Sequence, residues 1–297
     1  MKVKKIGMVG VILLLIFSGS SSFSLASQPG TTAANFLKIP VGARASAMGG
    51  AYTALCQDTT ALYWNPAGLV SCEEKELFAM YNSWFQDISQ GYFGAVYPRE
   101  KRAFGFAINY VDFGQMKRTT WENPTGTGEK FNATDICVSL GYGWRISSSL
   151  QTGIAIGYLK DTIAENEKST FLFNFGVQNK ISKNLSLGIA LQNLGGKLGD
   201  DLLPLTIRGG VAWTHSSLTT EVDLELPNDN DARIRTGFEW QLTPRLALRA
   251  GYQGDQDQGS GITLGLGLST KKFAMDYTYV PFGDLGNTSR VSFVIRW

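Results

Sequence analysis

Charged side chains in the second half of the chain are the residues whose types and spacing could do chemistry. They lie at alternate positions within segments where polar and apolar residues alternate. The set comprises Asp223, Glu225, Arg233, Arg235, Glu239, Arg245 and Arg249. Alternation with a period of two is typical of a β-strand, so these side chains would share one face of a sheet. The acids are interleaved with arginines, which gives no support to a carboxyl pair for acid–base catalysis.

Pairing across neighbouring strands would give this set a defined role. The expected opposed pairs are Glu225 with Arg233, Asp223 with Arg235, and Glu239 with Arg245. Opposite charges on adjacent strands attract, so together they would form a charge ladder on one inner wall. Two interpretations stay open. The ladder is a hydrophilic path or selectivity field for a translocated compound, or it is charge-balanced filling that fixes the wall and holds an internal segment.

No other residues form a recognisable reaction centre. The only histidine, His215, lies in an expected turn between distant strands, with no acid–nucleophile pair around it. Structural and catalytic zinc sites need several cysteine, histidine or acidic ligands together, and one isolated histidine does not supply them. We therefore expect no catalytic residue, no metal site and no cofactor, and we expect that the protein is not an enzyme.

The first 26 residues have the pattern of a secretory signal peptide. A lysine-containing start precedes an apolar run over residues 6–17, and Ser24-Leu25-Ala26 is a small-x-small cleavage site. That run is short for a bilayer span, which needs about 20 residues. Cleavage after Ala26 would remove three of the 27 basic residues and leave 24 beside 25 acidic ones. With no basic excess, we expect no nucleic-acid partner.

Two of the three cysteines bracket the aromatic segment Tyr63–Leu69, and the third, Cys137, lies in an expected strand. In an oxidising periplasm, Cys56 and Cys72 could form a disulfide. Closing a loop of this length would stabilise the fold by about 3 kcal/mol in the chain-entropy model. The alternative is two free thiols packed among small residues.

From Glu73 onward the chain has the pattern of β-strands. Polar and apolar residues alternate clearly, for example through Leu185–Leu191 and Ile262–Leu268. Tight turns alternate with mostly longer polar loops, the longest over residues 113–131, as in an outer-membrane barrel with short periplasmic turns. We expect about fourteen strands. Their expected ranges are 74–85, 89–98, 101–112, 132–146, 149–161, 168–181, 184–193, 204–214, 217–226, 231–241, 244–254, 260–269, 271–280 and 288–297.

Composition and the chain end agree with this barrel. The sequence has 34 glycines, 7 tryptophans, 11 tyrosines and 17 phenylalanines, and no run of 18 apolar residues follows Ala26. Helical membrane spans are therefore not expected. Apolar residues alternate to the last position, and Phe293, Ile295 and Trp297 resemble the signal read by the outer-membrane assembly machinery. We expect a location in the bacterial outer membrane.

Residues 27–72 contain the only long segment after the signal that does not have a strand pattern. A fourteen-stranded lumen lies between eight-stranded barrels, which side chains fill, and larger porins, which hold a water channel. The segment could fill that lumen, because its small residues around Arg44 allow close backbone packing. The expected organisation is an all-β, single transmembrane antiparallel barrel over 73–297, after a cleaved signal over 1–26. Residues 27–72 are expected to be an N-terminal periplasmic segment that enters the lumen as a plug (hatch).

The bulkiest part of the plug is Tyr63-Trp64-Asn65-Pro66-Ala67-Gly68-Leu69. Asp58 is placed to cap a short helical turn over residues 61–64, and Pro66 would end it. Asn65 can hydrogen-bond the local backbone at such a turn. Gly68 would permit an unusual backbone angle beyond it.

Residues 34–70 resemble the PorV/PorQ family of outer-membrane proteins, within the wider group of FadL-type long-chain fatty acid transporters. The resemblance rests on Asn35-Phe36-Leu37, Gly42-Ala43-Arg44, Ala47-Met48-Gly49-Gly50-Ala51 and the Tyr63–Leu69 motif. It implies a fourteen-stranded barrel whose N-terminal hatch carries the Asn-Pro-Ala element. The implied hatch residues are Arg44, Met48, Gly49, Gly50, Tyr63, Trp64, Asn65, Pro66, Ala67 and Gly68.

The resemblance implies two functions. A FadL-type barrel would pass small hydrophobic compounds across the outer membrane, with the hatch as gate. Alternatively, a PorV-type barrel would be a non-conducting component of a type IX-like secretion or surface-attachment system. The expected partners are outer-membrane lipids and the assembly machinery, with a lipid-like ligand or secretion-system proteins depending on the function.

Overall fold

The computed structural model describes residues 29–254 and 259–297, so the expected signal peptide lies outside the described residues. The chain begins with short helical elements: η1 (Asn35–Lys38), α2 (Ala43–Ala47), α3 (Ala61–Trp64) and η2 (Pro66–Ser71). In the described part of the chain, no helix is long and apolar enough to cross a membrane.

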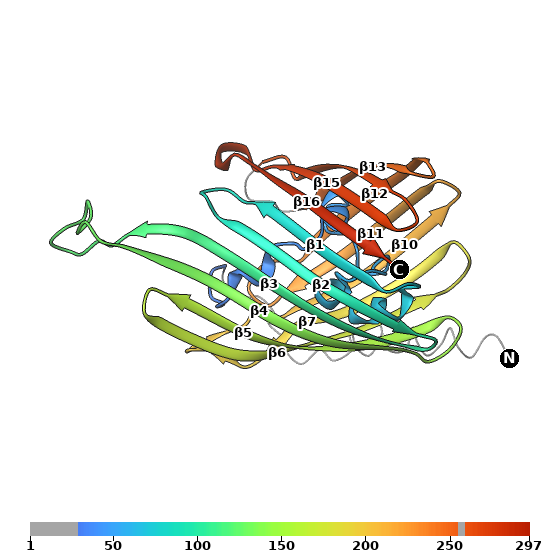
Figure 1. Cartoon of the computed structure of the whole chain (residues 1–297), viewed down its shortest axis with the longest axis horizontal. Coiled ribbons are helices and arrows are strands. Elements are labelled where there is room, and N and C mark those ends of the chain that lie inside the picture. The colour runs from blue at the N-terminus through green and yellow to red at the C-terminus, as the bar shows by residue number, and fades with distance from the viewer. Residues whose placement is uncertain (1–28, 255–258) are drawn as a thin grey trace.

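The rest of the described chain is almost entirely β-strand (Figure 1). The strands of the barrel are β1 (Glu76–Ser83), β2 (Ser89–Arg99), β3 (Arg102–Lys117), β4 (Lys130–Arg145), β5 (Leu150–Ile163), β6 (Asn166–Lys180), β7 (Leu185–Gly195), β10 (Thr206–His215), β11 (Leu218–Pro227), β12 (Arg233–Thr243), β13 (Leu246–Gln253), β14 (Ile262–Ser269), β15 (Phe273–Pro281) and β16 (Asn287–Arg296). Two further short strands, β8 (Lys197–Leu198) and β9 (Asp201–Leu202), pair with each other, and η3 (Gly283–Leu285) precedes β16.

The fourteen barrel strands that the described residues form close on themselves, with each strand antiparallel to its neighbours. β1 pairs with β16, so the first and last strands make the closing seam, with Glu76 opposite Arg296. The expected closed barrel of fourteen antiparallel strands is confirmed. Each expected strand corresponds to an observed one, although β3 continues to Lys117 and β4 begins at Lys130, where a loop was expected.

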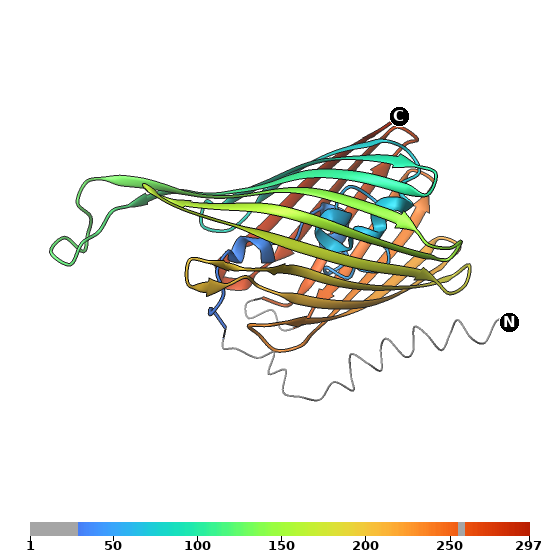
Figure 2. The ribbon, with the colours of Figure 1, turned by 90° about the horizontal axis from the view of Figure 1, so that it is seen from below.

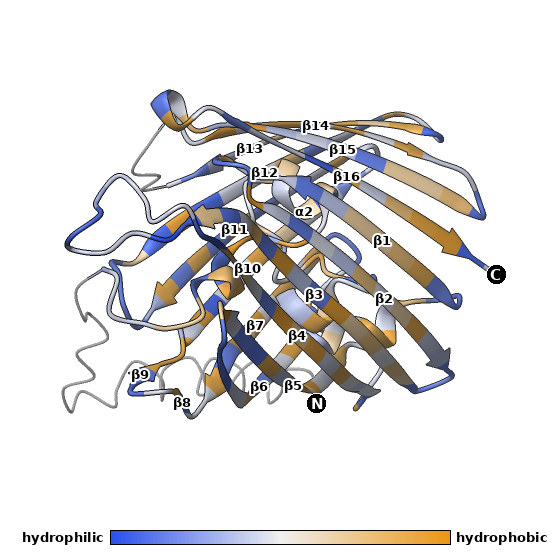
Figure 3. Ribbon diagram, turned by 60° about the vertical axis from the view of Figure 1, so that its left-hand side comes forward, coloured by the Kyte–Doolittle hydropathy of each residue, from blue (hydrophilic) through white to orange (hydrophobic). Residues whose placement is uncertain are grey.

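Alternation along the strands separates an apolar outer face from a polar and small-residue inner face (Figure 3). On β14, Leu264, Leu266 and Leu268 are exposed on the outside, whereas Thr263 is fully buried on the inside. Phe293, Ile295 and Trp297 at the chain end are also exposed. An apolar band on the outer face is typical of a barrel in a lipid bilayer.

The two rims of the barrel differ. One carries tight turns such as Glu100–Lys101 and Ser216–Ser217, and the other carries the longer connections. The β3–β4 hairpin extends far beyond this second rim (Figure 2), and Trp121 near its tip is 99% exposed. By the usual polarity of bacterial barrels, the short-turn rim is periplasmic and the long-loop rim is outside.

Small residues on the inner wall let the N-terminal segment lie directly against it. Gly143, Gly153 and Gly176 are neighbours in register across β4, β5 and β6. A Cβ atom on Gly153 would lie 2.3 Å from the Pro66 carbonyl oxygen, and one on Gly176 would lie 1.9 Å from Asn65 Oδ1. No heavier residue fits at these two positions without displacing the segment.

This contact predicts the effect of adding one methyl group to the wall. Gly153→Ala should lower the free energy of unfolding by about 1–3 kcal/mol, because overpacking forces the backbone at Pro66 to shift. Gly209→Ala on β10 is the matched control, since a Cβ there meets nothing within 4 Å. Urea unfolding of both variants in detergent measures the difference. Equal stability of the two variants would contradict the tight fit.

Candidate functional site

The N-terminal segment enters the barrel from the long-loop rim. Ala33 N donates to the carbonyl oxygen of Leu202 (2.9 Å), and Thr32 and Lys38 both contact the carboxylate of Asp229. The segment ends at the opposite rim, where β1 begins (Figure 2). The described start of the segment therefore lies at the long-loop rim, and the chain crosses the lumen before the first strand. If the short-turn rim is the periplasmic one, as is usual, the start lies on the side opposite to the expected one.

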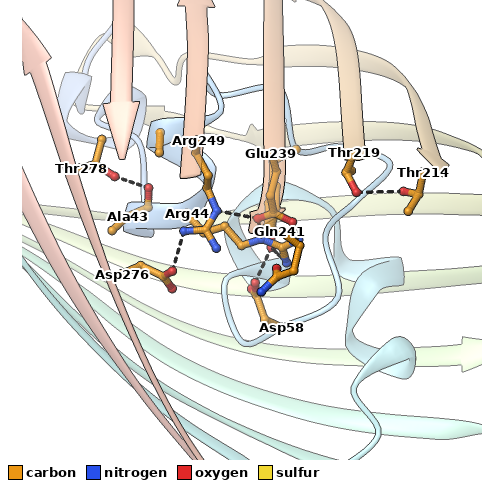
Figure 4. Close-up of polar contacts among 12 residues, drawn as sticks. Ala43, Arg44, Asp58, Thr214, Thr219, Glu239, Gln241, Arg249, Asp276 and Thr278 are labelled. Atoms are coloured by element: carbon orange, nitrogen blue, oxygen red, sulfur yellow. Dashed lines mark hydrogen bonds and ion pairs between the residues drawn. The ribbon is translucent and has the colours of Figure 1, made fainter. Parts of the chain in front are cut away.

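Arg44 on α2 is the centre of a charge network with the wall (Figure 4). Its guanidinium binds Glu239 on β12 through two hydrogen bonds, of 2.9 and 2.8 Å, and donates to the Tyr52 hydroxyl at 3.1 Å. Glu239 also pairs with Arg249 on β13 (2.5 Å), which in turn pairs with Asp276 on β15 (2.6 Å). Three wall strands therefore hold one arginine of the segment through alternating charges.

Within the segment, the same network continues through Tyr52. The Tyr52 hydroxyl donates to Asp58 Oδ2 at 2.6 Å, and the tyrosine is fully buried. Burial raises the pKa of Tyr52 well above its ordinary value, although the nearby Arg44 acts in the opposite direction. The phenol therefore stays protonated at neutral pH, and it links Arg44 to Asp58 as acceptor from one and donor to the other.

Two wall carboxylates bind the backbone of the segment just after Tyr52. Asp223 Oδ2 accepts from the backbone N–H groups of Tyr52 and Thr53, both at 3.1 Å. Glu221 accepts from the N–H groups of Ala54 (2.6 Å) and Leu55 (3.1 Å). Carboxyl oxygens can accept such hydrogen bonds in either protonation state. β11 thus supplies acceptors for four consecutive donors that would otherwise be buried without partners.

The aromatic pair Tyr63–Trp64 closes α3 and lies against β7 and β10. Trp64 is fully buried; its indole N–H donates to the Val41 carbonyl oxygen (2.8 Å), and the Arg208 guanidinium stacks 5.0 Å from its ring centroid. Gln192 donates to the carbonyl oxygens of Tyr63 (2.7 Å) and Trp64 (3.0 Å). An amide on the wall therefore satisfies the open carbonyl end of this short helix.

Asn65 joins three parts of the structure. Its side-chain amide donates to the carbonyl oxygens of Thr53 (2.8 Å) and of Val177 on β6 (3.3 Å). Its Oδ1 accepts from Ala67 N at 3.2 Å and so caps η2. The expected helical turn over 61–64 is present. Asp58 Oδ1 accepts from Thr60 N (2.8 Å), but no side chain caps α3.

Glycines in the segment serve two different needs. Gly49 and Gly50 have positive φ angles of 67° and 80°, and Gly49 lies against the wall backbone at Tyr252. Gly68 does not have the unusual backbone angle that we expected. It is glycine for another reason: a Cβ atom there would lie 2.3 Å from the Cys56 carbonyl oxygen. Met48 lies against Gly237 on β12, where a Cβ would be 2.6 Å from the Met48 carbonyl oxygen.

Cavities lie on both sides of the segment. On the outer side, a cavity of about 120 Å³ touches Gly49, Gly50, Tyr63 and Trp64. On the short-turn side, a cavity of about 520 Å³ touches Arg44 and Ala45. A third, of about 450 Å³, also lies on that side and again includes Arg44.

The charge ladder forms only in part. Glu225 lies opposite Arg233 and Asp223 opposite Arg235 in the register. In contacts, however, Glu225 pairs with Arg208 (2.9 Å) and Arg235 (3.1 Å), and Asp223 binds the segment instead of an arginine. The expectation for Arg245 is wrong. β12 runs to Thr243 and β13 begins at Leu246, so the hairpin turns at Pro244–Arg245 and not at Leu242. Arg249 therefore lies opposite Glu239, and Arg245 is exposed in the turn.

The proposed bond between Cys56 and Cys72 is not formed. Both cysteines are buried free thiols, and so is Cys137. Cys72 Sγ is turned to the carbonyl oxygen of Gln57, 3.4 Å away. Burial raises the pKa of both the Cys56 and Cys72 thiols well above the ordinary value. Of the two alternatives left open by the sequence, the structure contains the free thiols.

Several residues that matter for this site were not predicted. They are the wall amides that bind backbone carbonyls of the segment: Asn174 with Leu62, Gln178 with Thr53 and Cys56, and Gln192 with Tyr63 and Trp64. Their shared signal was present in the sequence. Each amide lies at an inward position of a strand and directly follows an apolar outward residue, and a large polar side chain buried there needs a partner.

The free thiols predict a specific labelling pattern. The folded protein in mild detergent should resist a maleimide reagent at pH 7, because burial and a raised pKa keep Cys56 and Cys72 as inaccessible thiols. After denaturation without reductant, three cysteines should react, as counted by mass spectrometry. Exported protein that labels at only one cysteine until it is reduced would show that the disulfide forms.

Solved structures with the same fold include transport proteins. The toluene transporter TodX of Pseudomonas putida superposes with a TM-score of 0.65 at 12% identity, covering 86% of this chain and 96% of that one. The monoaromatic hydrocarbon channel CymD gives 0.68 at 11% identity, over 87% and 98%. A FadL homologue of Pseudomonas aeruginosa gives 0.61 at 11% identity, over 87% and 99%. At these identities the likeness establishes the fold alone.

Sequence comparison adds the family. No curated protein sequence matches the chain. The model of a family described as uncharacterised protein family UPF0164 matches residues 18–201, which is more than half of the chain. This range includes the whole described N-terminal segment and the strands β1 to β7. The chain therefore belongs to the UPF0164 family.

Proposed function

We propose that this protein is a bacterial outer-membrane barrel that passes small hydrophobic compounds, with its N-terminal segment acting as a hatch. The shared fold with a toluene transporter, a monoaromatic hydrocarbon channel and a FadL homologue supports this function. The apolar outer face supports the membrane location. The hatch is defined here as residues 29–72.

One observation carries the gating part of the proposal: residues 42–56 lie between the outer and inner cavities. Gly49 and Gly50 border the outer cavity, whereas Arg44 and Ala45 border the largest inner one. Residues that border opposite cavities are therefore only a few positions apart in this layer of chain. A compound that reaches the outer cavity meets this single layer of chain, and a modest displacement of the layer would connect the two sides.

The surroundings of Tyr63 fit a small apolar ligand. Tyr63 borders the outer cavity together with Trp64, and it also borders a cavity of about 30 Å³ whose lining includes Leu62, Tyr92 and Leu172. Burial raises the pKa of Tyr63 to about 12, so its phenol is neutral at physiological pH. The small cavity combines mainly apolar walls with a few polar groups, as binding sites for small molecules do. The outer cavity is more polar, because charged residues such as Arg208 and Glu225 line much of it.

The secretion role implied by the PorV/PorQ resemblance stays a prediction, as do the partners expected with it. A barrel of that kind would retain partner proteins through affinity purification in mild detergent and would show no uptake of hydrophobic compounds. Transport and secretion therefore differ in two independent measurements.

A reversible lock tests whether the hatch must move. In Gly42→Cys/Thr60→Cys, the Cβ of residue 42 would lie 3.8 Å from that of residue 60, within the ~3.5–4.5 Å of natural disulfides, so the bond would tie the start of α2 to the residue before α3. The oxidised double variant should take up radiolabelled toluene no faster than cells without the barrel, and reductant should restore wild-type uptake. The two single variants control for packing. Wild-type uptake in the oxidised state would show that passage does not need the start of α2 to move. No uptake by the wild type would eliminate transport.

Loosening the hatch should have the opposite effect. Asn65→Ala/Pro66→Ala removes the hydrogen bonds to Thr53 and Val177 and should raise entry of large antibiotics such as vancomycin, measured as sensitivity of expressing cells. The chain offers a matched control in the exposed Asn123-Pro124 of the β3–β4 hairpin, where the same double change should leave sensitivity unaltered. Unchanged sensitivity of the hatch variant with normal folding would assign the motif to assembly.

A further inference from the structure

Arg290 on β16 is a buried arginine without an acid. Its exposed fraction is 2%, and no carboxylate among the described residues lies within 4.0 Å of it. Other arginines of the interior do have one. They are Arg44 with Glu239, Arg208 and Arg235 with Glu225, Arg249 with Glu239 and Asp276, and Arg296 with Glu76. Removing a guanidinium from water without a counter-charge is strongly unfavourable.

Polar atoms around Arg290 are also left without partners. Within the described chain, Nε and Nη2 of Arg290 are buried and form no hydrogen bond, and the same is true of the Thr288 hydroxyl and of Asn82 Oδ1. Thr288 lies two residues away on the same inward face, and Asn82 lies opposite Arg290 across the β1–β16 seam. These four atoms come from one small neighbourhood, whereas most buried polar atoms of proteins are hydrogen-bonded.

The remaining neighbours do not neutralise the charge. The Trp84 ring lies 5.2 Å from Arg290 Cζ and gives a cation–π contact. Such a contact is weaker than the penalty for burying an unpaired charge. Thr278, opposite Arg290 on β15, already donates its hydroxyl to the Ala43 carbonyl oxygen. Asn82 donates its amide to Gln90 at 3.0 Å.

We propose that Arg290 holds a small inorganic anion of halide size, such as chloride, at the closing seam of the barrel. Nε and Nη2 of Arg290 and the Thr288 hydroxyl would be its donors, and Asn82 Oδ1 would take a water. The anion must be small, because Arg290 is buried and borders none of the cavities described above. The anion compensates a buried charge that no carboxylate of the described residues compensates, and it joins β16 to β1 where the barrel closes.

Crystals of the wild-type protein soaked in bromide provide a direct test. Bromide replaces chloride and scatters anomalously, so an anomalous peak at hydrogen-bonding distance from the Arg290 guanidinium and the Thr288 hydroxyl is the expected result. Bromide peaks elsewhere on the protein with only water at Arg290 would overturn the proposal. A carboxylate of a lipid or detergent at that position would overturn it as well. Neither result depends on transport activity.

Stability measurements give a second, independent test. At constant ionic strength, replacing gluconate by chloride should raise the unfolding temperature of the wild type in a saturable manner. Arg290→Gln should abolish this rise. Arg245→Gln, the same change at an exposed turn, should retain it and so controls for general salt effects. An equal rise in wild type and Arg290→Gln would refute the site, and the bromide experiment decides the question if Arg290→Gln does not fold.

Discussion

The structure depends on a close approach between the backbone of an irregular segment and the inner wall of a barrel. A lumen of this width needs filling, and a short segment fills it best when its main chain touches the wall directly. The wall permits this where it has no side chains: Gly153 and Gly176 beneath Asn65-Pro66, and Gly251 beneath Gly49. These glycines cannot gain a Cβ without moving the segment, so the two parts of the chain constrain each other.

Close approach creates a second requirement, because backbone N–H and C=O groups inside the lumen lose contact with water. The wall replaces water with long polar side chains. Glu221 and Asp223 accept from consecutive N–H groups, while Gln178 and Gln192 donate to carbonyl oxygens. Acids of the inner wall therefore serve the segment as much as they serve the arginines of neighbouring strands. Glu221 and Asp223 are 1% and 0% exposed, so water cannot take the place of the segment as their hydrogen-bond partner.

The barrel was predictable from the sequence to a much greater extent than the site. The membrane on one side of the wall and the polar lumen on the other require apolar and polar residues to alternate along each strand. The fourteen strands and the pairing of Glu225 with Arg233 could therefore be predicted from this alternation in the sequence. The Arg245 prediction failed because the β12–β13 hairpin turns at Pro244–Arg245, two residues beyond the expected turn, and the alternation of residues does not mark where a strand stops. The Arg44–Glu239 pair joins residues 195 positions apart, which local patterns cannot reveal. The rim at which the segment enters is a tertiary property for the same reason.

If the segment acts as a gate, its two attachments are not equally ready to open. Glu221 and Asp223 hold residues 52–55 inside the barrel, where breaking their hydrogen bonds leaves buried polar groups without water. Arg44 is different: its side chain is 26% exposed and borders both inner cavities. Water on the periplasmic side can therefore solvate the Arg44 end as it separates from Glu239, while the Tyr52–Leu55 end stays bound. An opening that starts at α2 and pivots about Tyr52–Leu55 follows from this difference in solvation, and it would join the cavities at the point where residues 42–50 separate them.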